Sequence, residues 1–301
     1  MPFLFTCPHC DFSSRIANHF AGDSGPCVNC GKSVLILQPQ FEGSVDPDVK
    51  TSNATGLALL LILGGLVFFA TVGGLIYVVV VPQVARQRQN AVHQRTRLRL
   101  AKIGQALQMY SQSHGSYPPA ITYDAAGKPM HSWRVLILPE LGYPELHARY
   151  DFTQPWDSPV NSAIGYEMPV EYASATDPTA RSQNESSFYV ITGKGSAFPD
   201  SGTTRLEDIR DGTRDTVLVA ETPAYGFSWL EPRDIRLARL ESRVNGSPGQ
   251  SFASESPLGP QVLTADGEVR TLRFDAPAEA IPALATIDGG EAINWNAVAT
   301  D

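Results

Sequence analysis

The sequence predicts an α+β protein made of unlike segments: a small cysteine-bearing module, a long helix and a region of short strands. Three observations support this prediction. All four cysteines precede residue 31, no charge occurs between Gly56 and Val81, and short apolar runs punctuated by proline and glycine follow Tyr117. The length of 301 residues allows a sizeable core, and the composition excludes a collagen, a coiled-coil rod and a wholly disordered chain.

Charge is distributed unevenly along the chain. Residues 1–55 sum to -2, residues 56–81 carry no charge, residues 82–113 sum to +6 and residues 114–301 sum to -12, within a net charge of -8. Four cysteines are too few for a disulfide scaffold of this size. Each segment therefore has to be interpreted separately.

The N-terminal segment contains two C-x-x-C pairs separated by sixteen residues. This is a zinc-ribbon spacing, because each pair forms a tight turn that presents two thiolates, and two turns complete a tetrahedral site. About 40 residues cannot build a core alone, so the metal would supply most of the folding energy. The alternatives are two disulfides or a redox pair, although a redox pair lacks its βαβ surroundings. The predicted zinc ligands are Cys7, Cys10, Cys27 and Cys30, with Gly31 at a turn position that needs positive φ and His9 and His19 as bystanders.

A membrane-spanning helix is predicted from Gly56 to Val81. This run has 26 uncharged residues, and about 20 suffice to cross the ~30 Å hydrocarbon core of a bilayer. A signal peptide is the alternative, but the run starts late, is too long and is not followed by a small-residue cleavage site. Gly64-Gly65 and Gly73-Gly74 would allow lateral self-association, and Pro82 would kink the helix at its exit.

Two signals disagree on the orientation of this span. Six Lys and Arg residues follow it, against Lys50 alone before it, which favours a cytoplasmic C-terminal side. Zinc-binding thiolates survive in a reducing cytoplasm, and the region after the span has no cysteine to protect, which favours a cytoplasmic ribbon. The residues alone leave both orientations open.

A basic amphipathic helix is predicted over residues 82–113. We interpret its basic residues as contacts with lipid phosphates, and a nucleic-acid arm is the alternative. Gly115 and the following Pro118-Pro119 predict where the helix ends. The apolar stripe consists of Leu98, Ile103, Ala106, Leu107 and Tyr110, and the basic residues at its start are Arg95, Arg97, Arg99 and Lys102.

Short strands and long loops are predicted for residues 114–301. Asp124 to Gly127, Asp211-Gly212 and Asp266-Gly267 are turn signals, and the last two lie beside strand-like runs. The predicted strands are Arg134–Leu138, Phe188–Thr192, Thr216–Ala220, Gln261–Thr264 and Val269–Phe274.

A series of ordered motifs runs from Leu100 to about Phe274. The motifs are Ile103-Gly104-Gln105-Ala106-Leu107 with Tyr110, His114-Gly115-Ser116-Tyr117-Pro118-Pro119, His131-Ser132-Trp133-Arg134-Val135 with Leu138-Pro139, Pro155-Trp156-Asp157-Ser158-Pro159, Gly195-Ser196-Ala197-Phe198-Pro199, Ile209-Arg210-Asp211-Gly212-Thr213, Leu218-Val219-Ala220-Glu221, and Trp229 with Pro232-Arg233-Asp234-Ile235. Through them the chain resembles the planctomycete type IV pilin-like family of unknown function, domain of unknown function 1559 of the H-x9-DG type.

The resemblance implies a pilin-like fold, in which a long helix, embedded in the membrane at first, packs its second half on an antiparallel sheet. It also implies export of the sheet domain, which favours a cytoplasmic ribbon and an extracytoplasmic C-terminal domain. Three departures qualify it. The span has no glutamate of the kind that pairs with a neighbouring subunit, a ribbon stands where a short leader is usual, and Ser256 replaces the histidine ten residues before Asp266-Gly267.

No catalytic motif accompanies these features, so we expect no enzymatic activity. His114, His131 and His147 are not spaced as metal ligands. A calcium loop at Asp208, Asp211 and Asp215 is less favoured than ordinary turns. A carbohydrate groove is less favoured than buried packing for the tryptophans Trp133, Trp156, Trp229 and Trp295.

The organisation predicted is a zinc ribbon at 1–38, a linker at 39–55, a transmembrane helix at 56–81, a basic helix at 82–113 and a pilin-like domain at 114–301. The leading hypothesis is a single-pass surface or structural protein of the inner membrane, whose partners are the bilayer, further copies of itself and a protein at the ribbon. Nucleic acid is not expected, because the ribbon is net acidic. A sensor or secretion-associated scaffold, whose ribbon docks a cytoplasmic partner, is the alternative, and an extracellular enzyme is a third reading.

Overall fold

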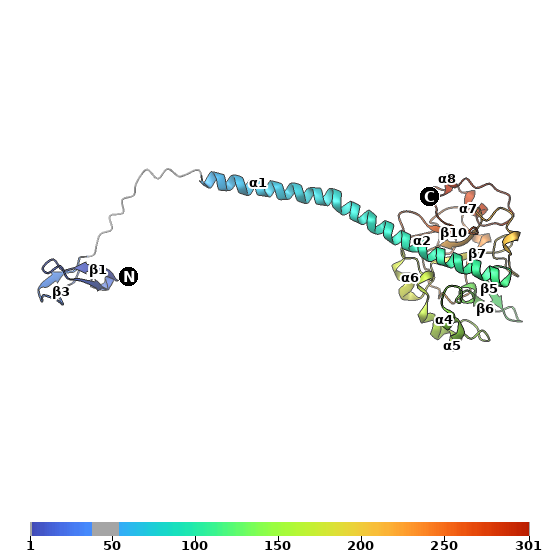
Figure 1. Ribbon diagram of the computed structural model, residues 1–301, viewed down its shortest axis with the longest axis horizontal. Coiled ribbons are helices and arrows are strands. Elements are labelled where there is room, and N and C mark those ends of the chain that lie inside the picture. The colour runs from blue at the N-terminus through green and yellow to red at the C-terminus, as the bar shows by residue number, and fades with distance from the viewer. Residues whose placement is uncertain (1, 38–53, 301) are drawn as a thin grey trace. The chain divides into compact units, whose positions relative to one another are not determined.

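The computed structural model describes residues 2–37 and 54–300 (Figure 1). The chain divides into two compact units, Met1–Gly73 and Gly74–Asp301. Most of the linker predicted at residues 39–55 lies outside the described residues.

The first unit begins with two small β-hairpins. Strand β1 (Phe3–Thr6) pairs with β2 (Ser13–Ile16), and β3 (Ser24–Pro26) pairs with β4 (Ser33–Leu35), both antiparallel. A short 3-10 turn, η1 (Asn18–Phe20), lies between the hairpins. Within residues 2–37, the buried apolar residues are Cys7, Cys27 and Val34, so this core is too small to hold the hairpins together without a cross-link or a metal.

One continuous helical stretch follows, made of α1 (Ala54–Leu75), the π-helical turn η2 (Ile76–Val80) and α2 (Val81–His114). Its limits agree within two residues with the helix expected from Gly56 to Ser113. The wide π turn lies directly before Pro82, which lacks an N–H and whose ring would clash with the carbonyl four residues earlier in a regular α-helix. Gly115 ends the helix with a φ of 77°, a left-handed conformation that glycine adopts without strain.

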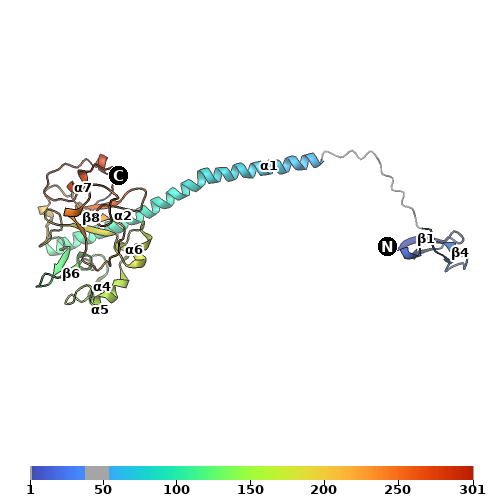
Figure 2. The same ribbon diagram turned by 180° about the vertical axis from the view of Figure 1, so that it is seen from behind.

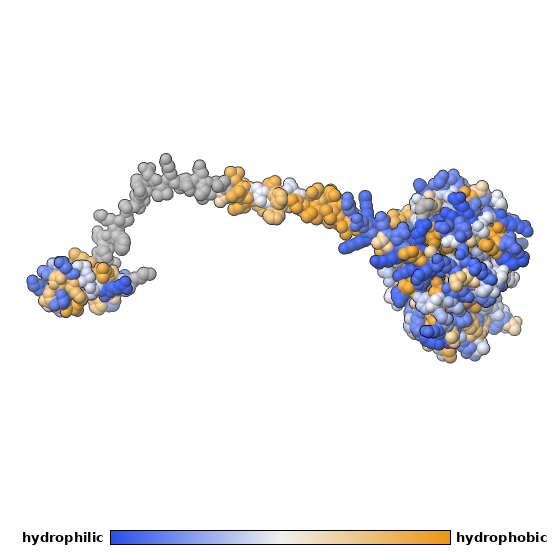
Figure 3. Space-filling view, in the orientation of Figure 1, coloured by the Kyte–Doolittle hydropathy of each residue, from blue (hydrophilic) through white to orange (hydrophobic). Residues whose placement is uncertain are grey.

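By length and composition this helix could cross a membrane. The apolar side chains from Leu59 to Val81 are almost all exposed, and Figure 3 shows this part of the helix as mostly hydrophobic. Such a surface is unstable in water and is matched by a lipid environment.

The second unit contains a five-stranded sheet with the order β11-β10-β8-β7-β9. Its strands are β7 (Phe188–Thr192), β8 (Val217–Glu221), β9 (Ile235–Arg236), β10 (Gln261–Thr264) and β11 (Val269–Thr271). Four of the five predicted strands are therefore confirmed. The sheet is antiparallel except at β9, a two-residue edge strand that runs parallel to β7.

The fifth predicted strand, Arg134–Leu138, is wrong. The chain forms α3 (Trp133–Leu136) there, because the Ser132 side chain accepts a hydrogen bond from the Arg134 backbone and caps the turn. A short buried apolar run suits a strand or a helix equally well, so its periodicity could not decide between them.

Shorter elements surround the sheet. They are the hairpin β5 (Ile121–Tyr123) with β6 (Pro129–Ser132), the helices α4 (Pro144–Arg149), α5 (Pro159–Ile164), α6 (Pro178–Gln183), α7 (Ala280–Ala283) and α8 (Trp295–Val298), and the 3-10 turns η3 (Gly165–Glu167), η4 (Val170–Tyr172), η5 (Leu206–Asp208) and η6 (Leu237–Arg239).

The sheet is covered on both faces. Along β7, Phe188 and Val190 belong to the core shared with α2, whereas Tyr189 and Ile191 belong to the core shared with α7 and α8. This alternation is the period of two expected for a strand buried on both sides. Figures 1 and 2 show α2 running beside the sheet and the chain's last helices on the other side of it.

The face of α2 that packs on the sheet consists of Leu100, Ile103, Ala106 and Leu107, with Tyr110 partly buried. The predicted stripe is correct except for Leu98, which is 65% exposed.

Two of the basic residues that were predicted to contact lipid phosphates bind other parts of the protein instead. Arg99 donates to the Ala173 carbonyl at 2.9 Å and Lys102 pairs with Glu171 at 3.0 Å, so both bind the domain itself. Arg86, Arg88 and Arg95 are exposed.

Close packing between α2 and β10 depends on Gly104. A Cβ atom at this position would lie 2.7 Å from Cδ1 of the buried Leu263. Gly104→Val should lower the free energy of unfolding by about 1–3 kcal/mol, since the core has no space for the added atoms. Denaturant unfolding of the variant measures this loss. Leu263→Ala should lower the free energy of unfolding by less in the Gly104→Val variant than in the natural sequence. Strictly additive effects would contradict the contact.

Acid should weaken the second unit through His131. Its imidazole is buried between the Tyr150 hydroxyl and the Phe152 carbonyl, and burial lowers the pKa of His131 below its usual value despite the carbonyl and Asp151. The folded state therefore favours neutral His131, so stability is full above pH ~6.5 and falls as the pH drops below it. Thermal melts between pH 7 and 5 should show a shallower decline for His131→Asn than for the natural sequence, and equal slopes would contradict this assignment.

Candidate metal centre

The four cysteines converge on one point between the two hairpins. All four Sγ atoms lie within 4.8 Å of one another, with Cys7 and Cys30 separated by 3.9 Å and Cys10 and Cys27 by 3.8 Å. Four sulfurs at about 2.3 Å from a tetrahedral zinc ion would lie about 3.8 Å apart, so the observed spacing fits such an ion. All four are free thiols rather than disulfides.

Two equivalent turns place these sulfurs. In the first, the Asp11 amide donates to the Cys7 carbonyl at 3.0 Å, and in the second the Gly31 amide donates to the Cys27 carbonyl at 2.8 Å. The residue that follows the second cysteine of each pair adopts a left-handed backbone conformation, with φ of 53° at Asp11 and 70° at Gly31. The role predicted for Gly31 is confirmed. Its counterpart Asp11 was missed, although aspartate is among the few non-glycine residues that tolerate this conformation.

Backbone and side-chain amides favour the thiolate form in part of the cluster. Hydrogen bonds from the backbone of Cys30 and of Asn29 lower the pKa of Cys27 to about 6. The Asn29 side chain also donates to Cys10 Sγ at 3.6 Å. At Cys30, a hydrogen bond from the Lys32 backbone is outweighed by burial and by the neighbouring sulfurs, which raise the pKa to about 11. Such crowding of thiolates is relieved by a bound cation.

Within residues 2–37 and 54–300, no other group of His, Cys, Asp or Glu residues is arranged to hold a metal. His9 and His19 are outside the cluster. Asp208, Asp211 and Asp215 bind separate protein donors: the Arg205 amide, the amides of Gly289 and Gly290, and the Trp295 indole. The less favoured calcium loop therefore receives no support from the geometry.

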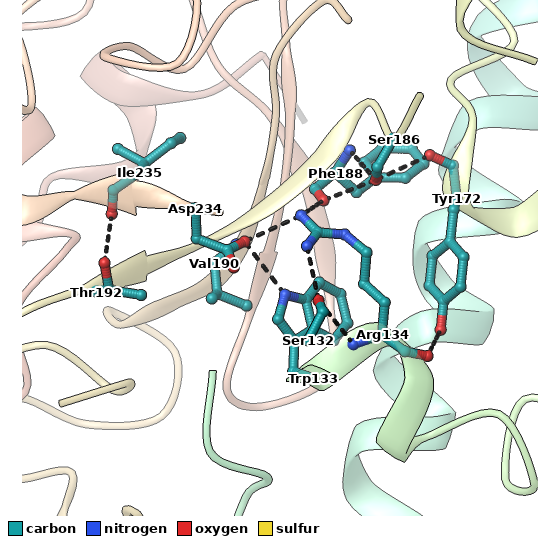
Figure 4. Close-up of polar contacts among 10 residues, drawn as sticks. All are labelled: Ser132, Trp133, Arg134, Tyr172, Ser186, Phe188, Val190, Thr192, Asp234 and Ile235. Carbon is teal, nitrogen blue, oxygen red and sulfur yellow. Dashed lines mark hydrogen bonds and ion pairs between the residues drawn. The ribbon is translucent and has the colours of Figure 1, made fainter. Parts of the chain in front are cut away.

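A buried ion pair joins two of the motifs in the second unit. Arg134 and Asp234, both with side chains no more than 1% exposed, meet at 3.0 Å (Figure 4). The same Asp234 oxygen accepts hydrogen bonds from the Trp133 indole and the Val190 amide. The Arg134 guanidinium also donates to the Phe188 carbonyl and the Ser132 hydroxyl. Burial raises the pKa of Asp234 although Arg134 opposes the shift.

Ser256, which stands where the resemblance implies a histidine, contacts a histidine from α2. His93 of α2 brings an imidazole to this place, with Nδ1 3.2 Å from the Ser256 hydroxyl and Nε2 3.0 Å from the Thr271 hydroxyl.

The expected packing role of the tryptophans is confirmed for Trp133, Trp229 and Trp295, which are buried, whereas Trp156 is only half-buried. His131 packs in the interior, as expected.

The fold and the site together define an α+β domain carried on a helix that could span a membrane, with a four-thiol cluster in the N-terminal unit. Residues 88–229 match the model of a family described as Protein of unknown function (DUF1559). The match runs from within α2 to Trp229 and supports the resemblance to this family of unknown function over that part of the chain. No curated protein and no solved structure matches the chain.

Proposed function

We propose that the protein is a single-pass, pilin-like surface protein of the inner membrane, without catalytic activity, whose N-terminal ribbon binds a structural zinc ion. The observation that carries the proposal is the continuous helix: its first part is apolar and exposed, and its second part packs on a sheet. This is the arrangement that the resemblance implies for a pilin-like fold. The thiol cluster adds the zinc ligands, because four sulfurs at this spacing suit zinc better than a hard cation.

In this proposal the ribbon is cytoplasmic and the acidic domain is extracytoplasmic. The cysteine distribution supports the orientation, since every thiol lies before the span. Protease treatment of intact cells that carry an N-terminal tag tests it. The domain after residue 114 should be degraded while the tag remains protected, and permeabilised cells should lose both. A cleaved tag with an intact domain would reverse the orientation.

A second candidate function is a scaffold whose ribbon docks a cytoplasmic protein. It is favoured by exposed apolar residues on the ribbon: Leu4 is 65% exposed, Phe12 42% and Val28 85%. Crosslinking in cells should then yield an adduct that Val28→Asp abolishes while bound zinc is retained. An adduct that is unchanged in Val28→Asp would argue against this surface.

A further inference from the structure

A polar cleft of about 500 Å³ lies in the second unit. Its walls come from distant segments, including Ile121 of β5, Trp156, Tyr225 and the stretch from Glu231 to Arg239. Its size falls within the ~300–1,000 Å³ that small-molecule sites occupy. The cleft is unrelated to the thiol cluster, which lies in the first unit.

Three arginines spaced three residues apart line this cleft. Arg233 pairs with Glu231 through Nε at 2.8 Å, and Arg236 pairs with Asp200 through Nη1 at 2.7 Å. Arg239 has no hydrogen-bond or ion-pair partner within the described part of the chain. Each guanidinium carries five N–H donors, so the cleft is rich in donors even where the arginines are paired. Arg239 therefore has its donors free for an anionic ligand.

Two aromatic side chains complete the walls. Trp156 and Tyr225 are both only partly buried, and neither the indole N–H nor the phenol hydroxyl has a protein partner among residues 2–37 and 54–300. Such side chains combine an apolar face with a polar edge. Trp156 is also the one tryptophan of the four that the core does not bury.

The framework behind the cleft is rigid. Asp234, beside Arg233, is anchored by the buried pair with Arg134, and the Arg233 guanidinium stacks on Phe227 at 3.6 Å from the ring centre. Gly249 lies against the Tyr225 ring, where a Cβ would approach to 2.6 Å. The Arg233 guanidinium and the Tyr225 ring are therefore positioned before any ligand arrives, which lowers the entropic cost of binding.

We propose that this cleft binds an acidic saccharide, a sugar that bears a carboxylate or a sulfate. Guanidinium groups bind such anions with charge-assisted, bidentate hydrogen bonds. The aromatic walls suit the apolar face of a sugar ring, and Glu231 and Gln250 can pair with its hydroxyls. A nucleotide also stacks and carries charge, so a nucleoside monophosphate serves as the competing ligand in the test.

Calorimetry on the full chain in detergent tests the proposal. Tri-galacturonate or a sulfated disaccharide should bind, and comparing the two distinguishes carboxylate from sulfate. Arg239→Gln and Trp156→Ala should each weaken binding about tenfold, whereas Arg210→Gln, an exposed residue paired with Asp288 away from the cleft, should not change it. Maltotriose, a neutral sugar of similar size, should bind much more weakly.

Three results would overturn the proposal: no binding of either acidic sugar by the folded chain, binding that Arg239→Gln leaves unchanged, or equal or tighter binding of inorganic sulfate or of a nucleoside monophosphate. Because Arg239 and Trp156 are not in the buried ion pair, circular dichroism of these variants should match that of the natural chain. The outcome does not depend on the zinc ion or on membrane orientation, so it is independent of the proposed function.

Discussion

Arg134→Met should lower the free energy of unfolding of the second unit by about 3–5 kcal/mol, because it leaves the Asp234 carboxylate buried without its counter-charge. For a unit of this size, each kcal/mol corresponds to about 2–4 °C in Tm, so thermal melts should resolve the change readily. The Trp133 and Val190 donors would remain on one Asp234 oxygen and would not replace the lost cation.

The effect should depend on pH in a definite direction. Burial already raises the pKa of Asp234, and loss of Arg134 raises it further, so the folded variant favours the neutral carboxyl. A folded pKa above the unfolded value means that stability is full at low pH and falls as the pH rises. The deficit of the variant relative to the natural chain should therefore be larger at pH 8 than at pH 5.

Two control variants separate this mechanism from a simple loss of packing. Arg149 and Glu167 form an exposed ion pair, with side chains 55% and 48% exposed, and Arg149→Met should cost less than about 1 kcal/mol. Arg134→Met combined with Asp234→Leu should recover much of the lost stability, since apolar residues replace both charges. A double variant as unstable as the single one would contradict an electrostatic origin.

Cys27→Ser should abolish zinc binding and unfold the ribbon while the second unit stays folded. The ribbon's described core holds little more than Cys7, Cys27 and Val34, so metal coordination has to supply most of its stability. Structural zinc contributes about 10–16 kcal/mol of apparent binding energy in small ribbons and fingers, far more than such a core can offer. Metal analysis of the purified full chain should give one zinc for the natural sequence and none for the variant.

Limited proteolysis reports on folding in the same samples. Cleavage within residues 2–37 should accelerate sharply in Cys27→Ser and in the natural chain treated with a strong chelator. His9→Ala is the matched control, because His9 lies between Cys7 and Cys10 in the other turn but outside the thiol cluster, and this variant should retain its zinc. Persistent protection of the metal-free ribbon, or disulfides in the purified protein, would show that another cross-link holds it.

Features encoded over a few residues could be predicted from the sequence. The helix limits follow from the uncharged run and from Gly115, and the strand Phe188–Thr192 follows from its apolar β-branched and aromatic residues. The grouping of the four cysteines also follows from local spacing, because each pair lies in one tight turn. The segment Arg134–Leu138 shows where this reasoning fails, since a run of five residues, four of them buried, contains too little periodicity to separate strand from helix.

The apolar helix, the grouping of the cysteines and most of the strands could be predicted, because their signals lie within a turn or a strand of the residues concerned. Which polar side chains pair with one another depends on the folded domain. Arg134 and Asp234 are 100 residues apart, and His93 and Ser256 are 163 apart, so neither contact leaves a local pattern. The walls of the arginine-lined cleft also come from segments that are far apart in the sequence, and the fold brings them together. Long-range contacts of this kind are chosen by the packing of the whole domain, and their partners cannot be read from either segment alone.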